Sequence, residues 1–227
     1  MDLGIRGRKA IICASSKGLG RGCALALAQA GVDVTINGRD PAGLARTAEE
    51  IATATGVKVT TVVADVGAPE GRAALLAACP QPDILVNNNA GPPLKDFRQL
   101  SHDDLVAGAN ANMFTPIELI QKVIDGMMER RFGRIINITS SSVKAPLAGL
   151  DLSSGARAGL TAFLAGIARQ VAGSNVTINQ IMPGAFDTDR LAVTAVAQAK
   201  ARDIGTADEP VAAPALRLST SLGPAAE

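Results

Sequence analysis

The chain lacks tyrosine and tryptophan altogether, and it has one histidine among its 227 residues. The absence of tyrosine excludes proton transfer by a phenol, and a single histidine excludes a metal site built on several imidazoles. The cysteines Cys13, Cys23 and Cys79 form no CxxC pair, so we predict buried, reduced thiols and no metal ion. His102 lies in a Ser-His-Asp-Asp string, which indicates the start of a surface helix rather than a catalytic triad.

Long apolar runs and runs of like charge are also missing. No stretch reaches the roughly 18 apolar residues of a transmembrane helix, so no membrane span is predicted. The N-terminus has neither the apolar core nor the cleavage site of a signal peptide, and we therefore expect a cytoplasmic protein. The net charge of +1 and the absence of a basic run give no reason to expect nucleic acid or a membrane surface as a partner.

What the chain does contain is a regular alternation of short β-type runs with longer helical stretches rich in small residues. Strands are predicted at residues 9–14, 32–37, 58–64, 83–87, 134–138 and 176–181. Helices are predicted at residues 18–30, 41–55, 115–131 and 153–171, with shorter ones ending at 79 and opening at 101. This order is typical of an α/β fold in three layers, a doubly wound, Rossmann-type parallel sheet forming a single domain over residues 1–227.

The last part of the chain has a different amino-acid composition. After about residue 186 the sequence is rich in alanine, proline, threonine and serine, and it contains no convincing strand. Residues 191–202 are compatible with an amphipathic helix. We therefore expect residues 186–227 to form a substrate loop and a C-terminal segment that is partly disordered.

A glycine-rich turn follows the first predicted strand directly. Glycines at positions 18, 20 and 22 let the backbone turn sharply and approach a pyrophosphate, and the helix that begins there offers free N–H groups. Glycine-rich turns also occur without a ligand, but the place of this one after the first strand of an α/β chain favours a dinucleotide. The predicted contacts are Ser15, Ser16, Lys17, Gly18, Leu19 and Gly20.

The end of the second predicted strand indicates which dinucleotide is bound. A chain that binds NAD usually places Asp or Glu there, to accept hydrogen bonds from the ribose hydroxyls. Here the residues are Asn37, Gly38 and Arg39, and Lys17 adds a second cation from the glycine turn. Two cations without a carboxylate suit a 2′-phosphate, so we predict NADP (NADPH). The alternative is that both cations are simply solvated surface groups.

Further motifs occur in a recognisable order: Ala64-Asp65-Val66, Asn88-Asn89-Ala90-Gly91, Asn112, Asn137-Ile138-Thr139-Ser140 and Pro183-Gly184. With the glycine turn, they make the chain resemble the short-chain dehydrogenase/reductase family, in its 3-oxoacyl-carrier-protein reductase-like branch, from about residue 5 to 190. The resemblance implies that Ser140 is the catalytic serine and that Asn112 holds a proton-relay water. It also implies cofactor contacts from Asp65, Val66, Asn89, Ala90, Gly91, Pro183, Gly184 and Thr188.

Two positions depart from the family pattern at the centre of its chemistry. The family usually has a tyrosine thirteen residues after the serine and a lysine four residues later, where this chain has Ser153 and Arg157. The resemblance then implies that Arg157 holds the nicotinamide ribose. Ser140 and Ser153 would polarise a carbonyl, and either Ser153 or water relayed from Asn112 would deliver the proton. Lys144 and Asp151 are alternative donors, but a surface cation and a helix N-terminal acid are the simpler interpretations of these two residues. A serine hydroxyl is a poor general acid near neutral pH, because its pKa lies above that of tyrosine.

From the resemblance we also expect residues 1–227 to lack the last helix and strand that the family usually carries, which commonly pack a dimer or tetramer. The leading hypothesis is an NADP-dependent oxidoreductase that transfers hydride between NADPH and a ketone or oxoacyl carbonyl of a small molecule. We expect a homodimer or homotetramer in the full-length form. The alternative is a catalytically silent NADP(H)-binding sensor or scaffold, since both the tyrosine and the lysine are replaced.

Overall fold

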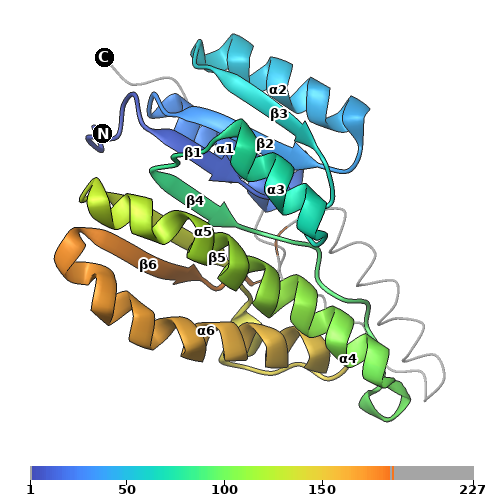
Figure 1. The fold of residues 1–227 in the computed structure, drawn as a ribbon. Coiled ribbons are helices and arrows are strands. Elements are labelled where there is room, and N and C mark those ends of the chain that lie inside the picture. The colour runs from blue at the N-terminus through green and yellow to red at the C-terminus, as the bar shows by residue number, and fades with distance from the viewer. Residues whose placement is uncertain (1, 185, 187–227) are drawn as a thin grey trace, which may run out of the picture. The chain divides into compact units, whose positions relative to one another are not determined.

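Parallel strands form one sheet in the part of the chain that the structure, a computed structural model, describes, namely residues 2–184 and 186 (Figure 1). The strands are β1 (Lys9–Ile12), β2 (Asp33–Gly38), β3 (Val59–Val63), β4 (Ile84–Asn87), β5 (Gly133–Ile138) and β6 (Val176–Ile181). Their order across the sheet is β3-β2-β1-β4-β5-β6, and every neighbouring pair is parallel. This is the strand order of a doubly wound Rossmann sheet, as the sequence predicts.

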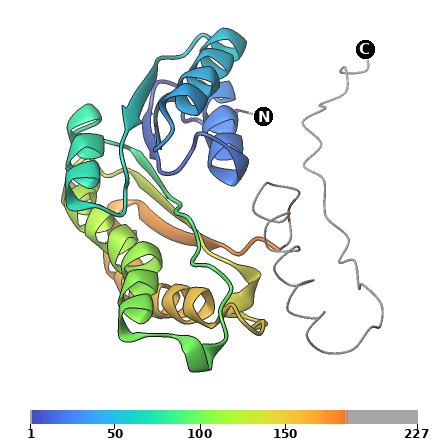
Figure 2. The same cartoon turned by 90° about the vertical axis from the view of Figure 1, so that its right-hand side faces the viewer.

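Helices connect the strands and cover both faces of the sheet (Figure 2). They are α1 (Gly18–Gln29), α2 (Pro41–Thr55), α3 (Pro69–Ala78), α4 (His102–Ala109), α5 (Thr115–Glu129) and α6 (Asp151–Val171). α1 and α2 connect β1, β2 and β3, which follow one another toward one edge of the sheet. α5 and α6 connect β4, β5 and β6, which follow one another toward the opposite edge. Right-handed crossovers therefore place the two pairs of helices on opposite faces.

Each face of the sheet has its own apolar core, because successive strand residues point to opposite sides. Ile11 of β1 packs with α3, α5 and α6, whereas Ile12 packs with α1 and α2. On the second face, Ala24 and Ala28 of α1 are fully buried, and their small side chains let this helix approach the sheet closely. The core therefore holds the strand ends in fixed positions relative to the helices that begin there.

The predicted elements are confirmed, with differences at their ends. β1 ends at Ile12, two residues before the prediction, because Ala14 adopts a left-handed φ of 46° and opens the turn. α6 begins at Asp151, two residues earlier than predicted. The sequence patterns also missed a π-helical turn, η2 (Asn110–Phe114), which joins α4 and α5 into one continuous helical segment.

The remaining predictions have mixed outcomes. Cys13 and Cys79 are buried free thiols, as predicted, whereas Cys23 is only half-buried. Within the described residues, no helix combines the length and apolarity needed to cross a bilayer. Residues 183–227 are a separate unit, and the predicted helix at 191–202 lies outside the described residues.

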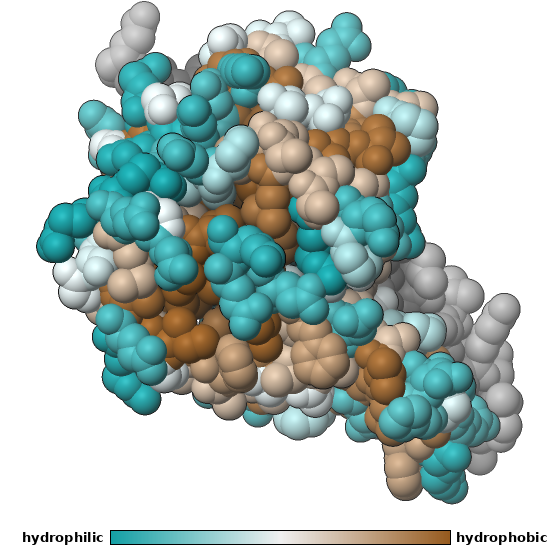
Figure 3. All heavy atoms as spheres, in the orientation of Figure 1, coloured by the Kyte–Doolittle hydropathy of each residue, from teal (hydrophilic) through white to brown (hydrophobic). Residues whose placement is uncertain are grey.

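Figure 3 shows polar side chains over much of one face of the molecule, with apolar ones at the surface over α4, where Leu105 and Val106 are exposed.

Candidate functional site

The candidate residues gather at the carboxyl edge of the sheet, around the point where the winding direction reverses. β1 and β4 are neighbours there, but the chain leaves β1 toward β2 and leaves β4 toward β5. The loops after these two strands therefore diverge and leave a crevice at the strand ends, which is where open α/β sheets bind their ligands. The glycine turn follows β1 and the asparagine motif follows β4, so both lie at this crevice.

The glycine turn brings the N-terminus of α1 close to β1. Gly18 has a left-handed φ of 57°, and a Cβ atom on Gly20 would lie 2.4 Å from the carbonyl oxygen of Ala14. The N-cap residue, Lys17, has no acceptor atom in its side chain, so it does not cap the first N–H groups of the helix. α2, by contrast, is capped by the carboxylate of Asp40. The turn thus fits the pyrophosphate of a dinucleotide, because it presents uncapped N–H groups and a positive helix end.

Ser15 stabilises this turn through hydrogen bonds of its side chain. Its hydroxyl donates to the carbonyl oxygen of Ile12 at 2.7 Å and accepts a hydrogen bond from the backbone N–H of Asn37 at 3.0 Å. The residue is fully buried, so the side chain connects β1 to β2. A contact of Ser15 with a cofactor stays a prediction, and the structure gives the residue a bracing role.

Asn37 has a similar internal role at the end of β2. Its Nδ2 donates to the carbonyl oxygens of Val62 and Ala64, at 3.1 and 2.9 Å, and its Oδ1 accepts from the N–H of Ala14 at 3.3 Å. The residue is 1% exposed. The side chain therefore joins the glycine turn to β2 and β3, a role that its position in the sequence did not indicate.

Two exposed charged groups lie beyond the ends of β2 and β3. The side chain of Arg39 is 73% exposed, and its Nη1 lies 4.0 Å from Oδ2 of Asp65, which is itself 53% exposed. A pair this long and this solvated contributes little energy, so the guanidinium is able to exchange its partner for a phosphate. Asp65 also accepts a hydrogen bond from the N–H of Gly67, and Val66 beside it is buried.

The asparagines at the end of β4 and directly after it connect this strand end to three neighbours. Nδ2 of Asn87 donates to Oδ1 of Asn137 on β5, and Nδ2 of Asn88 donates to the carbonyl oxygen of Ala14 in the glycine turn. Nδ2 of Asn89 donates to the carbonyl oxygen of Ala111 in η2. The motif thus holds the edges of the crevice together, while contacts of Asn89, Ala90 and Gly91 with a cofactor stay predictions.

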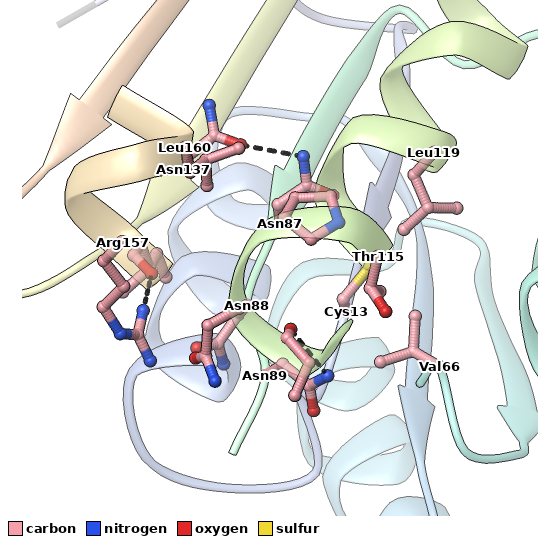
Figure 4. A pocket seen from close by; sticks show the side chains of 14 residues that line it. Cys13, Val66, Asn87, Asn88, Asn89, Thr115, Leu119, Asn137, Arg157 and Leu160 are labelled. Atoms are coloured by element: carbon pink, nitrogen blue, oxygen red, sulfur yellow. Dashed lines mark hydrogen bonds between the residues drawn. The ribbon is translucent and has the colours of Figure 1, made fainter. Parts of the chain in front are cut away.

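A small cavity lies between this motif, η2 and α6 (Figure 4). The cavity has a volume of about 20 Å³, enough for one water molecule. Asn112 lines it and is 4% exposed; its Nδ2 donates to the carbonyl oxygen of Gly108, while its Oδ1 has no partner among the described residues. Oδ1 of Asn87 and Oγ1 of Thr115, on two other lining residues, also lack partners there. Unpartnered buried oxygens around such a space indicate a site for water.

Ser153 and Arg157 lie one turn apart on α6 and contact each other. Nε of Arg157 donates to Oγ of Ser153 at 3.1 Å, and its Nη1 donates to the carbonyl oxygen of Ile138 at 2.7 Å. Ser153 is 6% exposed and Arg157 is 8% exposed. The guanidinium therefore links α6 to the end of β5, and the strand end leads directly to Ser140.

Ser140 forms a second polar contact that sequence reasoning missed. Its Oγ accepts a hydrogen bond from the backbone N–H of Ser142 at 3.1 Å and another from the Ser142 hydroxyl at 2.9 Å. Ser142 belongs to a short helical turn, η3 (Ser141–Val143), and is almost completely buried. The run of three serines at 140–142 was the available signal, because serines two residues apart form such local hydrogen bonds readily.

Few of the groups at the cavity titrate. Among the 14 lining residues in Figure 4, the titratable groups are the Cys13 thiol and the Arg157 guanidinium. Burial raises the pKa of Cys13 to about 12, so its thiol stays protonated near neutral pH.

His102 is exposed at the start of α4, as predicted. That helix start carries a capping box between Ser101 and Asp104, and hydrogen bonds from Lys95 and Ser101 lower the pKa of Asp104 to about 2.

The last predicted contacts follow β6. β6 ends at Ile181, and Pro183 and Gly184 follow after one further residue, Met182. Thr188 lies outside the described residues. Lys17, Gly18 and Leu19 lie in the turn or in the first residues of α1, as the prediction requires, and Ser16 precedes them. Contacts of all these residues with a cofactor stay predictions.

Comparison with known proteins agrees with this arrangement. The family model for short chain dehydrogenases matches residues 8–198. The chain is 32% identical over 191 residues to a 3-oxoacyl-[acyl-carrier-protein] reductase of Pseudomonas aeruginosa, covering 82% of this chain and 77% of that protein. It is 33% identical over 190 residues to a (2S)-[(R)-hydroxy(phenyl)methyl]succinyl-CoA dehydrogenase subunit of Thauera aromatica, covering 82% of this chain and 76% of that one.

Solved structures show the same fold. L-sorbose reductase from Gluconobacter frateurii, complexed with NADPH and L-sorbose, superimposes with a TM-score of 0.82 at 28% identity, covering 88% of this chain and 78% of that one. A 7α-hydroxysteroid dehydrogenase complexed with NADH has a TM-score of 0.77 at 25% identity, covering 83% and 75%. Sequence, strand order and crevice agree, and the chain belongs to the short-chain dehydrogenase family of oxidoreductases.

Proposed function

We propose that this protein is an NADP(H)-dependent oxidoreductase that transfers hydride between NADPH and a ketone or oxoacyl carbonyl of a small molecule. The observation that carries the choice of cofactor is the exposed Arg39 at the end of β2, where no carboxylate occupies positions 37 to 39. The named structural neighbours include complexes with NADPH and with NADH, so the fold alone does not choose between them. The charges of this chain favour the 2′-phosphate.

The residues of the crevice fit a dinucleotide. Gly18, Leu19 and Gly20 present the N-terminus of α1 to the pyrophosphate, and Arg39 with Lys17 faces the 2′-phosphate. Asp65 and Val66 contact the adenine, while Asn89, Ala90 and Gly91 line the rest of the cofactor. Contacts of Pro183, Gly184 and Thr188 stay expectations from the family resemblance. When bound, the nicotinamide supplies the hydride for carbonyl reduction or accepts it in the reverse reaction.

The reacting carbonyl would lie near Ser140 and Ser153, the two hydroxyls linked through Arg157 and the end of β5. Arg157 also keeps a permanent positive charge beside the ribose, since a guanidinium does not deprotonate in proteins. Asn112 holds a water molecule in the small cavity, which is supported by its unpartnered Oδ1 and by the volume of that space. We also propose a homodimer or homotetramer, which light scattering on the purified protein tests directly.

Substitution of Arg39 by alanine tests the cofactor preference. We expect the dissociation constant for NADPH to rise about tenfold to a hundredfold, because a charge-assisted hydrogen bond to a phosphate contributes about 1.5–3 kcal/mol. The NADH constant should stay unchanged, because that cofactor has no 2′-phosphate. Cofactor fluorescence measures both. Arg169→Ala, which removes another exposed guanidinium from α6, is the matched control and should leave both constants as they are. Equal weakening of NADPH and NADH by Arg39→Ala would contradict the proposed role.

Turnover separates a reductase from a silent binding protein. The protein is incubated with NADPH and a panel of ketones, aldehydes and 3-oxoacyl thioesters, and the loss of NADPH absorbance is followed. We expect loss that depends on the carbonyl compound. Tight NADPH binding without consumption on any member of the panel would contradict the proposed reaction.

A further inference from the structure

Arg72 of α3 carries a buried guanidinium that the proposed function does not use. The residue is 8% exposed, and its Nη1 donates to the carbonyl oxygens of Val66 and Gly67, at 3.2 and 2.8 Å. Its Nη2 donates to Oε2 of Glu118 on α5. A buried charge is costly unless it is paired and hydrogen-bonded, and here a carboxylate and two carbonyl oxygens meet both conditions. Both carbonyl groups belong to the turn between β3 and α3, so the guanidinium holds this turn.

The contact of Arg72 reaches Asp65 through Gly67. The carbonyl oxygen of Gly67 accepts from the guanidinium, while the N–H of the same residue donates to Oδ1 of Asp65 at 2.8 Å. The position of Gly67 therefore sets the orientation of the Asp65 carboxylate. The side chain of Asp65 is 53% exposed, so a carboxylate held in this orientation is accessible to a ligand.

The first turn of α3 packs directly against the backbone of Asp65. A Cβ atom on Gly71 would overlap the carbonyl oxygen of Asp65, and the N–H of Ala68 donates to that same oxygen at 3.1 Å. Arg72 follows Gly71 in the chain, so its side chain begins beside the turn that it holds. The close approach leaves the guanidinium within reach of both the turn and α5.

Glu118 ties the guanidinium to α5. It lies in the first turn of this helix, between Thr115 and Leu119, which line the small cavity together with Val66 (Figure 4). The pair of Arg72 and Glu118 therefore joins the turn after β3 to a second element that borders the cavity. The side chain of Glu118 is 48% exposed, so solvent weakens the attraction of the two charges. The main effect of the carboxylate is thus to direct the guanidinium.

We propose that Arg72, oriented by Glu118, is a positioning residue for recognition of the adenine ring. It holds Gly67, and through it Asp65, so that the carboxylate accepts a hydrogen bond from the exocyclic amino group of adenine. This inference rests on the proposed function, in which Asp65 contacts the adenine. Arg72 acts through Asp65 and not by contact with the cofactor.

The probe is the reduced hypoxanthine analogue of NADPH, in which a carbonyl oxygen replaces the adenine amino group. A carboxylate that accepts from the amino group discriminates between the two nucleotides, because the oxygen of the analogue has no proton to donate. We expect the unaltered protein to bind NADPH about tenfold to a hundredfold more tightly than the analogue, the usual effect of a hydrogen bond to a charged group. Cofactor fluorescence measures both dissociation constants, and Asp65→Ala should remove the discrimination.

Arg72→Met removes the guanidinium and keeps an unbranched apolar side chain. We expect most of the discrimination to be lost, because the Asp65 carboxylate is no longer held toward the ring. Added to Asp65→Ala, this substitution should not change the ratio of the two constants further, since residues that act through one contact are not additive.

The partner residue provides a second pair of variants. Glu118→Ala changes a half-exposed position, so it keeps the test available even where Arg72→Met does not fold, and it should lower the discrimination in the same direction. Glu118→Gln keeps an acceptor oxygen for Nη2 of Arg72 and should retain the discrimination.

Arg130→Met is the matched control. Nη2 of Arg130 donates to the carbonyl oxygen of Pro82 at 2.9 Å, and its Nε lies 3.9 Å from Oδ1 of Asp83, so this arginine also joins a carbonyl group to a carboxylate. Its contacts precede β4, at the edge of the sheet opposite the crevice. Its removal should lower the stability, measured by thermal unfolding, and leave the ratio of the two dissociation constants as it is.

The outcomes separate positioning from a purely structural role. Equal weakening of NADPH and its analogue by Arg72→Met, with the ratio retained, would overturn the inference, and so would full discrimination in Glu118→Ala. An unaltered protein that binds both nucleotides equally would also overturn it, while the cofactor assignment, which rests on Arg39 and the 2′-phosphate, stands. If NADPH does not bind at all, the proposed function fails and the inference fails with it.

Discussion

Replacement of Gly20 by alanine is expected to destroy the glycine turn, and with it both NADPH binding and much of the stability of the fold. The new Cβ atom would lie 2.4 Å from the carbonyl oxygen of Ala14 and 2.9 Å from the Cα atom of Ser15. Both are backbone atoms, so no side chain is able to move aside. Relief requires α1 to shift away from β1, which opens the core around Ala24 and Ala28.

We expect the free energy of unfolding to fall by about 3 kcal/mol or more, at or above the upper end for overpacked sites. Denaturant unfolding followed by circular dichroism measures this loss, and cofactor fluorescence measures NADPH binding. Gly22→Ala is the matched control, because nothing lies within 4 Å of a Cβ at that exposed position of the same helix. It should stabilise the protein by about 0.5–1 kcal/mol, the usual gain for alanine over glycine inside a helix. Equal behaviour of the two variants would contradict the close approach of α1 to β1.

Replacement of Asn37 by aspartate is expected to destabilise the protein strongly without creating a preference for NADH. The amide Nδ2 donates to the carbonyl oxygens of Val62 and Ala64, and a carboxylate oxygen in its place would face both of them. Buried charge beside two acceptors should cost at least about 3 kcal/mol at neutral pH. From sequence alone, an acid at this position would be expected to accept the ribose hydroxyls of NADH; the structure turns the side chain inward instead.

The pH dependence of this variant has a defined sign. Burial and the two carbonyl oxygens raise the pKa of the introduced carboxyl group in the folded protein above its unfolded value of about 3.9. The stability loss relative to the unaltered protein is therefore small below about pH 4 and grows as the pH rises through the interval between these two pKa values. Thermal unfolding of both proteins at several pH values measures it.

Asn110→Asp makes the same chemical change at an exposed position and should alter stability by less than about 0.5 kcal/mol. A gain in NADH affinity by Asn37→Asp, with the fold intact, would show that the side chain reaches the cofactor after all.

The sequence predicted the strands, the main helices and the position of the crevice with good accuracy. The reason is that these depend on local patterns: β-branched runs make strands, glycines permit the turn, and alternation with helices requires parallel pairing. The differences lie at element ends, as at Ile12, and in the turn η2. A π-helical turn depends on how the helical segment packs against its neighbours, which no short stretch of sequence encodes.

The site divides in the same way. By itself, the sequence determined the dinucleotide turn, the family resemblance and the absence of the usual tyrosine and lysine, because each is a matter of residue type and spacing. Only the tertiary structure decided that the side chain of Asn37 faces inward and that Ser142 donates hydrogen bonds to Ser140. It also decided that Arg157 donates to Ser153 and to the end of β5. Of these contacts, those of Asn37 and the bond from Arg157 to β5 join segments that lie far apart in the chain, and hydrogen-bond direction follows from which donor meets which acceptor once the segments have packed.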